Sequence, residues 1–442
     1  MKLRLMGSLM MGPVPRRTFW WLLAAYLVLR VYLATLPGYV DDIDWYKRWA
    51  LATATSGLSA AYETTNVDYP PFMLYPMYLV GKIYLMFDPD LTTEAVRNST
   101  LFTALVKSPN VVFDLVSGGL LFWLVGRGGL WGRSLADPGW GRLVALLYLW
   151  NPAVLWGSGY WGQPDAILGA LSLAALGALG FARTSVAGAL LSAAVLTKPL
   201  AAPLVPLMAW GTAATRGFKG LLSLGIGGLA AALVVFLPFL LTGRLSSVLA
   251  KVLADIETMP FTSINAHNLW WILGPWRDAN ATVLVVLTPK LIGLLLFGAA
   301  YAALLMRLNG RVRQAAKDPG EYCSLIFLIS AAVSSSFFFL STHLHENHLF
   351  LAVPLLLGVA GRSRQLALLA LGCSLAVFLN MILHDLELPY HMPSFLGGSS
   401  GVMDPYLGRP YTWMQLVGSY LNTLLVAVVA GGTYLAAWKV GK

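Results

Sequence analysis

Long apolar runs recur along the 442-residue chain and determine its fold class. Most runs extend for about 18 to 23 residues, the length that a helix needs to cross a hydrocarbon core of about 30 Å. A soluble fold would interrupt such runs with polar residues at the helical or strand period. We therefore expect an all-α, polytopic transmembrane protein with about 12 to 14 membrane-spanning helices and with interfacial helices in its outer loops.

The apolar runs predict individual spans near 18–36, 142–157, 165–182, 184–198, 199–214, 220–241, 281–306, 322–341, 348–361, 365–384 and 414–436. Two further runs, 69–87 and 109–126, occupy a stretch in which an odd number of crossings is required. Either 69–87 is re-entrant or lies at the outer surface, or the polar stretch 92–106 makes a third crossing. We prefer the first alternative, because Glu94 and Arg97 would be costly in lipid.

The charges agree with a membrane topology. Only 11% of the residues are charged, 57% are hydrophobic, and the net charge is +10. Basic clusters are distributed one per loop, beginning with Lys2, Arg4, Arg16 and Arg17. Since Lys-rich and Arg-rich short loops stay on the cytoplasmic side, both termini are expected inside and the motifs described below outside. This distribution indicates topology rather than nucleic-acid binding. Composition favours the cell membrane of a prokaryote over the endoplasmic reticulum membrane of a eukaryote.

The first outer loop begins with three carboxylates in four residues, Asp41, Asp42 and Asp44. Clustered acids of this kind bind a divalent cation, supply a general base with a raised pKa, or simply begin a hydrated helix. The loop ends at Asp68-Tyr69-Pro70-Pro71, where consecutive prolines force an extended backbone.

Ionisable residues also occur at or inside predicted spans, where they indicate function by default. Asp114 needs a partner, Lys107 lies nearby in sequence, and Lys198 either extends to the interface or neutralises a lipid phosphate. Between two spans lie Trp161, Gln163 and Asp165, a combination suited either to an ordinary polar turn or to a sugar ring and its hydroxyls.

Two polar clusters follow in the second half of the chain. One contains Asn265 and His267, with two tryptophans close behind, and the other is His343-Leu344-His345-Glu346. The histidines of the second cluster do not share one helical face, which disfavours a helical zinc motif. They are better suited to binding a phosphate group.

Taken together and in order, these motifs resemble the GT-C superfamily of glycosyltransferases, closest to the dolichyl-phosphate-glucose glucosyltransferases and their prokaryotic relatives. The similar segments are Asp42 to Trp49, Asp68-Tyr69-Pro70-Pro71, Lys107-Ser108-Pro109 with Asp114, Gly162-Gln163, Thr197-Lys198-Pro199 and His343-Leu344-His345-Glu346. The family's His-rich lead-in to the Gly162-Gln163 turn is missing, which leaves the sugar and the acceptor open.

The resemblance implies an inverting hexosyltransferase that moves a sugar from a polyprenyl- or dolichyl-phosphate donor to a lipid-linked glycan on the outer or lumenal membrane face. The alternatives are a mannosyl- or arabinosyl-transferase of the same superfamily, or a glycolipid transporter or flippase. One membrane-embedded domain would cover 1–442, with a catalytic module at 18–215 that includes loop 37–68. Variable helices at 216–442 would follow, with outer loops at 242–280 and 385–413.

The expected site residues fall into three groups. Asp42 is the expected general base, with Asp44 as the alternative. The donor phosphate is assigned to Lys198, His343, His345 and Lys107. The sugar or acceptor is assigned to Gln163, Asp165, Trp161, Asp68, Tyr69, Glu346, Asn265 and His267. No cofactor is required by this scheme, although a divalent cation at Asp41, Asp42 and Asp44 remains open.

Overall fold

A computed structural model describes residues 12–88, 92–255, 259–384, 397–404 and 408–441. Lys2, Arg4 and much of the expected outer loop 385–413 lie outside the described residues. The described chain is mostly helical and divides into two compact units, an N-terminal unit (Met10–Thr258) and a C-terminal unit (Met259–Lys442). The expected division near residue 215 into a catalytic and a variable part stays a prediction.

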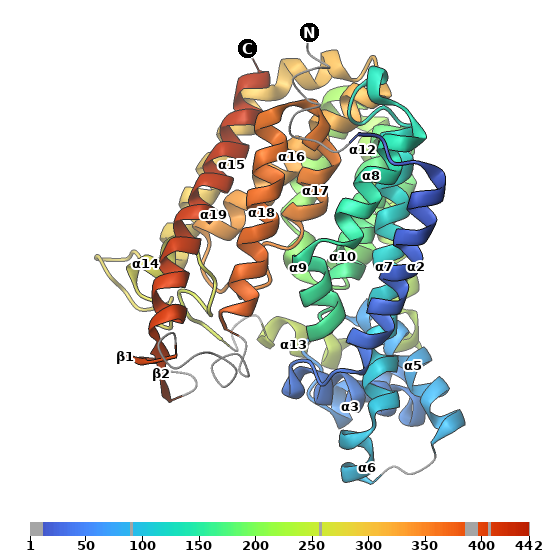
Figure 1. Cartoon of the computed structure of the whole chain (residues 1–442), viewed down its shortest axis with the longest axis vertical. Helices are drawn as coiled ribbons and strands as arrows, with labels where there is room; N and C mark the ends of the chain where they lie inside the picture. The colour runs from blue at the N-terminus through green and yellow to red at the C-terminus, as the bar shows by residue number, and fades with distance from the viewer. Residues whose placement is uncertain (1–11, 89–91, 256–258, 385–396, 405–407, 442) are drawn as a thin grey trace. The chain divides into compact units, whose positions relative to one another are not determined.

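The N-terminal unit contains helices of very different length. They are α2 (Arg16–Thr35), α3 (Val40–Ser56), α4 (Leu58–Thr64), η1 (Pro71–Met73), α5 (Leu74–Phe87), α6 (Thr93–Asn98), α7 (Thr100–Gly126), η2 (Arg133–Leu135), α8 (Pro138–Leu149), α9 (Pro152–Val154), the π-helix η3 (Leu155–Trp161), α10 (Asp165–Gly180), α11 (Thr184–Val195), η4 (Pro199–Ala201), α12 (Leu204–Leu241) and α13 (Leu245–Asp255). Helices α2, α7, α8 and α10 lie side by side, while α3, α5 and α6 gather at one end of this group (Figure 1).

The C-terminal unit consists of helices and one two-stranded sheet. Its elements are α14 (Leu269–Leu273), α15 (Pro289–Ala315), α16 (Pro319–Leu340), α17 (Ala352–Val359), η5 (Ala360–Arg362), α18 (Arg364–Ile382), β1 (Ser399–Asp404), β2 (Arg409–Thr412) and α19 (Trp413–Val440). The strands pair antiparallel, directly before α19. The described residues of the outer loop 385–413 contain this sheet, and the expected interfacial helix in that loop stays a prediction.

Seven helical segments of the described chain are long and apolar enough to cross a membrane: Arg16–Thr35, Thr100–Gly126, Pro199–Leu241, Pro289–Ala315, Pro319–Leu340, Arg364–Ile382 and Trp413–Val440. These segments make the chain a membrane-embedded protein, and the expected total of about 12 to 14 spans stays a prediction. Within the long segment, α12 is interrupted at Gly217, where φ is 62° and ψ is −158°. This break lies between the predicted spans 199–214 and 220–241.

In the region 69–126, the helices begin at other residues than the predicted runs 69–87 and 109–126, since α5 begins at Leu74 and α7 at Thr100. Helix α5 has 14 residues, about 21 Å at 1.5 Å per residue, which is too short for the hydrocarbon core. The polar stretch 92–106 makes no crossing of its own, because α6 has only six residues and α7 already begins at Thr100. Helix α7 continues through Pro109, and the Ser108 hydroxyl donates to Leu105 O, the carbonyl that Pro109 cannot serve.

Side-chain caps explain where many helices begin. Ser99 Oγ accepts from Phe102 N at the start of α7, and Thr288 does the same for Leu291 N at α15. At α19, Thr412 and Gln415 form a reciprocal capping box. Each cap satisfies a backbone N–H that the first helical turn leaves without a partner.

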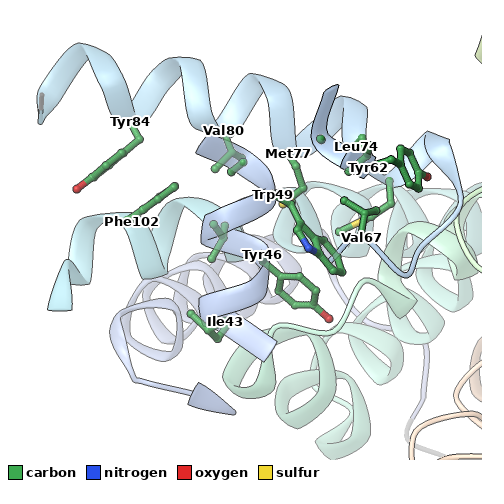
Figure 2. Close-up of a cluster of buried hydrophobic side chains, with 14 of the residues drawn as sticks. Ile43, Tyr46, Trp49, Tyr62, Val67, Leu74, Met77, Val80, Tyr84 and Phe102 are labelled. Atoms are coloured by element: carbon green, nitrogen blue, oxygen red, sulfur yellow. The ribbon is translucent and has the colours of Figure 1, made fainter. Parts of the chain in front are cut away.

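An aromatic-rich cluster anchors α3 against α5 and the start of α7. Figure 2 shows Tyr46 and Trp49 of α3 beside Met77 of α5, all of them buried. Tyr84 and Phe102 stack with ring centroids 3.9 Å apart. Because these side chains bury large apolar areas and hold preferred ring geometries, the cluster fixes the orientation of α3.

Close packing of α11 on α12 depends on glycine. A Cβ placed on Gly227 would lie 1.9 Å from Ser185 O, whereas one on Gly225 would meet nothing within 4 Å. Small residues of this kind let membrane helices approach closely, and close approach supplies much of their association energy.

We predict that Gly227→Ala lowers the stability of the protein by about 1–3 kcal/mol, because the methyl group forces the backbones apart. The matched variant Gly225→Ala in the same helix should be neutral or stabilising by up to about 1 kcal/mol, through helix propensity alone. Thermal unfolding in detergent micelles measures both. Equal effects of the two variants would contradict the role of close approach.

Candidate functional site

The carboxylate of Asp42 is held from one side by two N–H donors. Asp42 lies in the first turn of α3, and its Oδ2 accepts hydrogen bonds from Trp161 Nε1 at 2.8 Å and from Gln163 Nε2 at 2.7 Å. No described residue donates a hydrogen bond to Oδ1. The two oxygens are thus unequal: Oδ2 is occupied, and Oδ1 has its lone pairs available.

The environment raises the pKa of Asp42. Burial is the largest cause and raises it, while the Trp161 hydrogen bond, the positive charge of Lys198 and the Gln163 hydrogen bond each lower it, in that order. The net direction is upward because desolvation of the carboxylate exceeds the help from its donors. A carboxyl whose pKa is shifted towards neutrality is suited to taking a proton.

A chain of hydrogen bonds orients the Gln163 amide. The Tyr69 hydroxyl donates to Gln163 Oε1 at 3.3 Å, and a further hydrogen bond joins Tyr46 and Tyr69. Since Oε1 accepts from Tyr69, the Gln163 NH₂ group must face Asp42. Every donor in the series Tyr46, Tyr69, Gln163 therefore points towards Asp42 as the final acceptor.

Two glycines bring the segments of the site together. Gly38 (φ 69°) follows α2, and a Cβ there would lie 2.5 Å from Tyr160 O. Gly162 (φ 94°) follows the π-helix η3, and a Cβ there would lie 2.8 Å from Ile43 Cδ1. Asn110 Nδ2 donates to Gly162 O at 2.9 Å. Both turns need a left-handed backbone and close contact, a combination that glycine supplies.

Lys198 and Asp165 form a buried ion pair beside Tyr69. Lys198 Nζ lies 2.9 Å from Asp165 Oδ1 and 5.8 Å from the centroid of the Tyr69 ring. The structure thus joins a residue expected to bind phosphate to one expected to bind sugar hydroxyls. A phosphate that used Lys198 would have to compete with Asp165, so both assignments stay predictions.

The other acidic residues of this region point elsewhere. Asp44 pairs with Arg97 at 2.9 Å, and Lys47 donates to the carbonyls of Val96, Arg97 and Ser99 around the end of α6. Asp41 and Asp68 are exposed. Asp42, and not Asp44, therefore contacts Trp161 and Gln163. The described residues contain no group of three His, Cys, Asp or Glu placed to hold a metal ion, and the cation at Asp41, Asp42 and Asp44 stays a prediction.

Lys107 was expected to bind the donor phosphate, and in the structure its ammonium group contacts backbone carbonyls. The fully buried side chain donates to Leu36 O at 2.7 Å and to Leu33 O at 3.4 Å, at the end of α2. A lysine ammonium is favourable there, because the last carbonyls of a helix carry partial negative charge. Lys107 thus ties α7 to the turn that leads into Asp42.

Asp114 has the partner that its position in a span requires, and that partner is Arg30 of α2. Arg30 Nη1 lies 2.9 Å from Asp114 Oδ2, and both side chains are buried. Tyr148 donates to Asp114 Oδ1 at 2.8 Å, and Ser158 of η3 contacts both members of the pair. Arg30 was missed at the sequence level, although it is a charge inside the first apolar run and calls for a buried acid.

The C-terminal unit carries the second set of expected site residues. His343 N donates to Phe261 O at 3.0 Å, and Ile264 N donates to Leu344 O at 2.9 Å, so the segment around His343 lies beside the segment around Asn265. Asn265 and His343 both have positive φ, 56° and 60°. His345 Nδ1 lies 4.0 Å from Glu346 Oε2. Strained backbone of this kind is often found at functional positions.

His267 is completely buried in the C-terminal unit. Its Nδ1 accepts from Asn422 Nδ2 at 2.8 Å, and its Nε2 lies 2.8 Å from His384 Nε2. Because Nδ1 accepts a hydrogen bond, the single ring proton of the neutral imidazole must lie on Nε2. His267 Nε2 therefore donates to His384 Nε2. Burial lowers the pKa of both rings, that of His384 to about 3. His267 links its loop to α18 and α19, and a role in binding sugar stays a prediction.

No model of a known protein family matches this chain, and no curated protein sequence is significantly similar to it.

We predict that Asp114→Ala destabilises the N-terminal unit by about 3–5 kcal/mol, because Arg30 is left as an unpaired buried charge. The double variant Arg30→Met, Asp114→Leu should lose much less than the sum of the two single changes. The half-exposed pair Arg244–Glu63 is the matched control, and Arg244→Met should cost about 0–1 kcal/mol. Unfolding in mixed detergent micelles provides the measurement; additive losses would contradict the coupling.

Proposed function

We propose that this chain is an inverting glycosyltransferase that moves a hexose from a polyprenyl-phosphate donor to a hydroxyl of a lipid-linked glycan. The observation that carries the proposal is the Asp42 carboxylate, with Oδ2 held by Trp161 and Gln163 and with no donor to Oδ1 among the described residues. The order of motifs that resembles the GT-C superfamily supports the same reaction class.

The reaction needs a base, an oriented sugar and a leaving group. Asp42 Oδ1 takes the proton of the acceptor hydroxyl as its oxygen attacks the anomeric carbon. The bond from that carbon to the donor phosphate oxygen breaks, and its electron pair leaves with the phosphate. General base catalysis of this kind contributes about 10²–10⁴-fold. Attack opposite the leaving group inverts the configuration at the anomeric carbon.

The fixed donors explain why Oδ2 cannot replace Oδ1 in this role. Trp161 and Gln163 bind the lone pairs of Oδ2 and hold the carboxylate plane, so that Oδ1 keeps one orientation. The Gln163 amide cannot pass a proton on to Tyr69, because its NH₂ group only donates and its Oε1 already accepts from the Tyr69 hydroxyl. The proton therefore leaves Asp42 from the Oδ1 side.

The surroundings of Asp42 suit a polyhydroxyl ligand. Trp161 is buried and stacks on Tyr39 with ring centroids 4.1 Å apart, which fixes the indole that donates to Asp42. The Lys198–Asp165 pair places an ammonium and a carboxylate near Tyr69. Lys198 is the candidate phosphate ligand of the N-terminal unit. Glucose, mannose and arabinose are alternative sugars, and a glycolipid transporter is the alternative function.

We expect Asp42→Asn to abolish sugar transfer, because an amide cannot take the hydroxyl proton, while the folded protein still binds the donor. Asp44→Asn, the matched control, should retain activity, since Asp44 pairs with Arg97. The assay follows radiolabelled sugar from a panel of polyprenyl-phosphate sugars into a total lipid extract, using purified protein in liposomes. Loss in Asp44→Asn alone would move the base to Asp44. Labelled lipid that crosses the bilayer without transfer would support the transporter.

Transfer should fall as the pH drops through the raised pKa of Asp42, because only the carboxylate form accepts the proton. Gln163→Leu removes a donor that favours the charged form, so the acid limb of the rate profile should move to higher pH. Tyr75→Phe, which removes a hydroxyl that donates to Val235 O, is the control and should leave the limb in place. An unchanged limb in Gln163→Leu would contradict Asp42 as the titrating base.

A further inference from the structure

A short apolar hairpin precedes α15 and is exposed on the C-terminal unit. Its members Val283, Leu284, Val285 and Val286 are 61%, 63%, 87% and 73% exposed. The sequence predicted a span from 281, but the helix starts only at Pro289, with Thr288 as its N-cap. Residues 281–287 therefore lie outside the helix that their mostly apolar sequence predicted. The segment between α14 and α15 extends outward from its unit (Figure 1).

The hairpin is closed by its own backbone. Val283 N donates to Leu287 O at 2.9 Å, and Leu287 N donates to Leu284 O at 2.7 Å. Val285, the most exposed of the four residues, has a φ of 51°, a conformation that a β-branched side chain rarely adopts. The turn thus directs adjacent aliphatic side chains outward even though the backbone is strained.

The length of α15 indicates what surrounds these side chains. The uncharged stretch of this helix runs from Leu291 to Met306, between Lys290 and Arg307. At 1.5 Å per residue it covers about 24 Å, less than the hydrocarbon core of about 30 Å. With Arg307 at one boundary of the core, the opposite boundary lies beyond the start of α15, at the level of the residues that precede it.

The adjoining face of α15 is apolar as well. Leu291, Leu294 and Leu295 are exposed on the first turns of the helix. In a membrane-embedded chain such a face meets acyl chains, and the hairpin continues that surface past the helix end. Four adjacent aliphatic side chains are unfavourable in water and favourable among acyl chains.

We propose that the hairpin Val283–Val286 inserts into the lipid leaflet at the N-terminal end of α15 and anchors the loop 259–288 to the membrane surface. The partner is the acyl-chain region of the lipid. The closed turn limits the number of backbone groups that enter the leaflet without hydrogen bonds, which is the main obstacle to placing a loop in lipid. The hairpin extends the apolar length of α15 and corrects its mismatch with the bilayer.

The test uses an environment-sensitive fluorophore on Val285→Cys, in a full-length background in which the buried Cys323 and Cys373 are replaced by alanine. The protein is reconstituted in phosphatidylcholine vesicles with and without lipids that carry a nitroxide near the headgroup. We expect emission shifted to shorter wavelength, quenching by the nitroxide lipid and protection from aqueous iodide. Val286→Cys repeats the measurement if the first variant is poorly folded.

The matched control is Asn280→Cys, an exposed polar position three residues before the hairpin. It should be quenched by iodide and show little response to the nitroxide lipid. Quenching of the Val285→Cys fluorophore by iodide would overturn the proposal. Protection from both quenchers would also overturn it, because another protein surface or a second copy of the chain would then cover the hairpin. The readout does not depend on any sugar-transfer activity.

Discussion

The absence of water from the hydrocarbon core is the constraint on which the N-terminal unit depends. A charge placed there needs a partner inside the protein, and Arg30 finds it in Asp114, with Ser158 and Tyr148 completing the contacts. This network joins α2 to α7, α8 and the π-helix η3. Two of these joined helices lead directly to the candidate site. Helix α2 ends shortly before Asp42, and η3 ends at Trp161. The buried ion pair therefore aligns the two parts of the chain whose side chains meet at the candidate site.

In the candidate site, the directions of the hydrogen bonds fix the orientation of each side chain. Tyr69 orients Gln163, and Gln163 with Trp161 holds one oxygen of Asp42. Burial raises the pKa of the carboxyl, while the Trp161 and Gln163 hydrogen bonds and the charge of Lys198 limit that rise. Lys107 and the glycines at 38 and 162 keep the backbones close enough for these contacts to form. The arrangement favours proton transfer at the remaining oxygen, which is the step that the proposed reaction requires.

The C-terminal unit uses polar residues in a different way. The contacts of His267 with Asn380 of α18 and Asn422 of α19 tie an outer loop to both helices from within. The same loop region carries the exposed aliphatic hairpin before α15. The buried His267 contacts and the exposed hairpin Val283–Val286 therefore lie in neighbouring parts of the chain.

The sequence by itself determined the membrane-embedded, mostly helical class, because apolar runs of spanning length can satisfy their backbone groups only as helices. It also predicted a break between 199–214 and 220–241, and the need of Asp114 for a partner. Only the tertiary structure decided which residue that partner is, since Arg30 lies 84 positions away from Asp114 in the chain. It likewise separated Asp42 from Asp44 by their contacts, joined Lys198 to Asp165, and placed residues 283–286 outside α15. Hydropathy and motif spacing report local preference, whereas the choice of partner for a charge depends on which side chains long-range packing brings within a few ångströms.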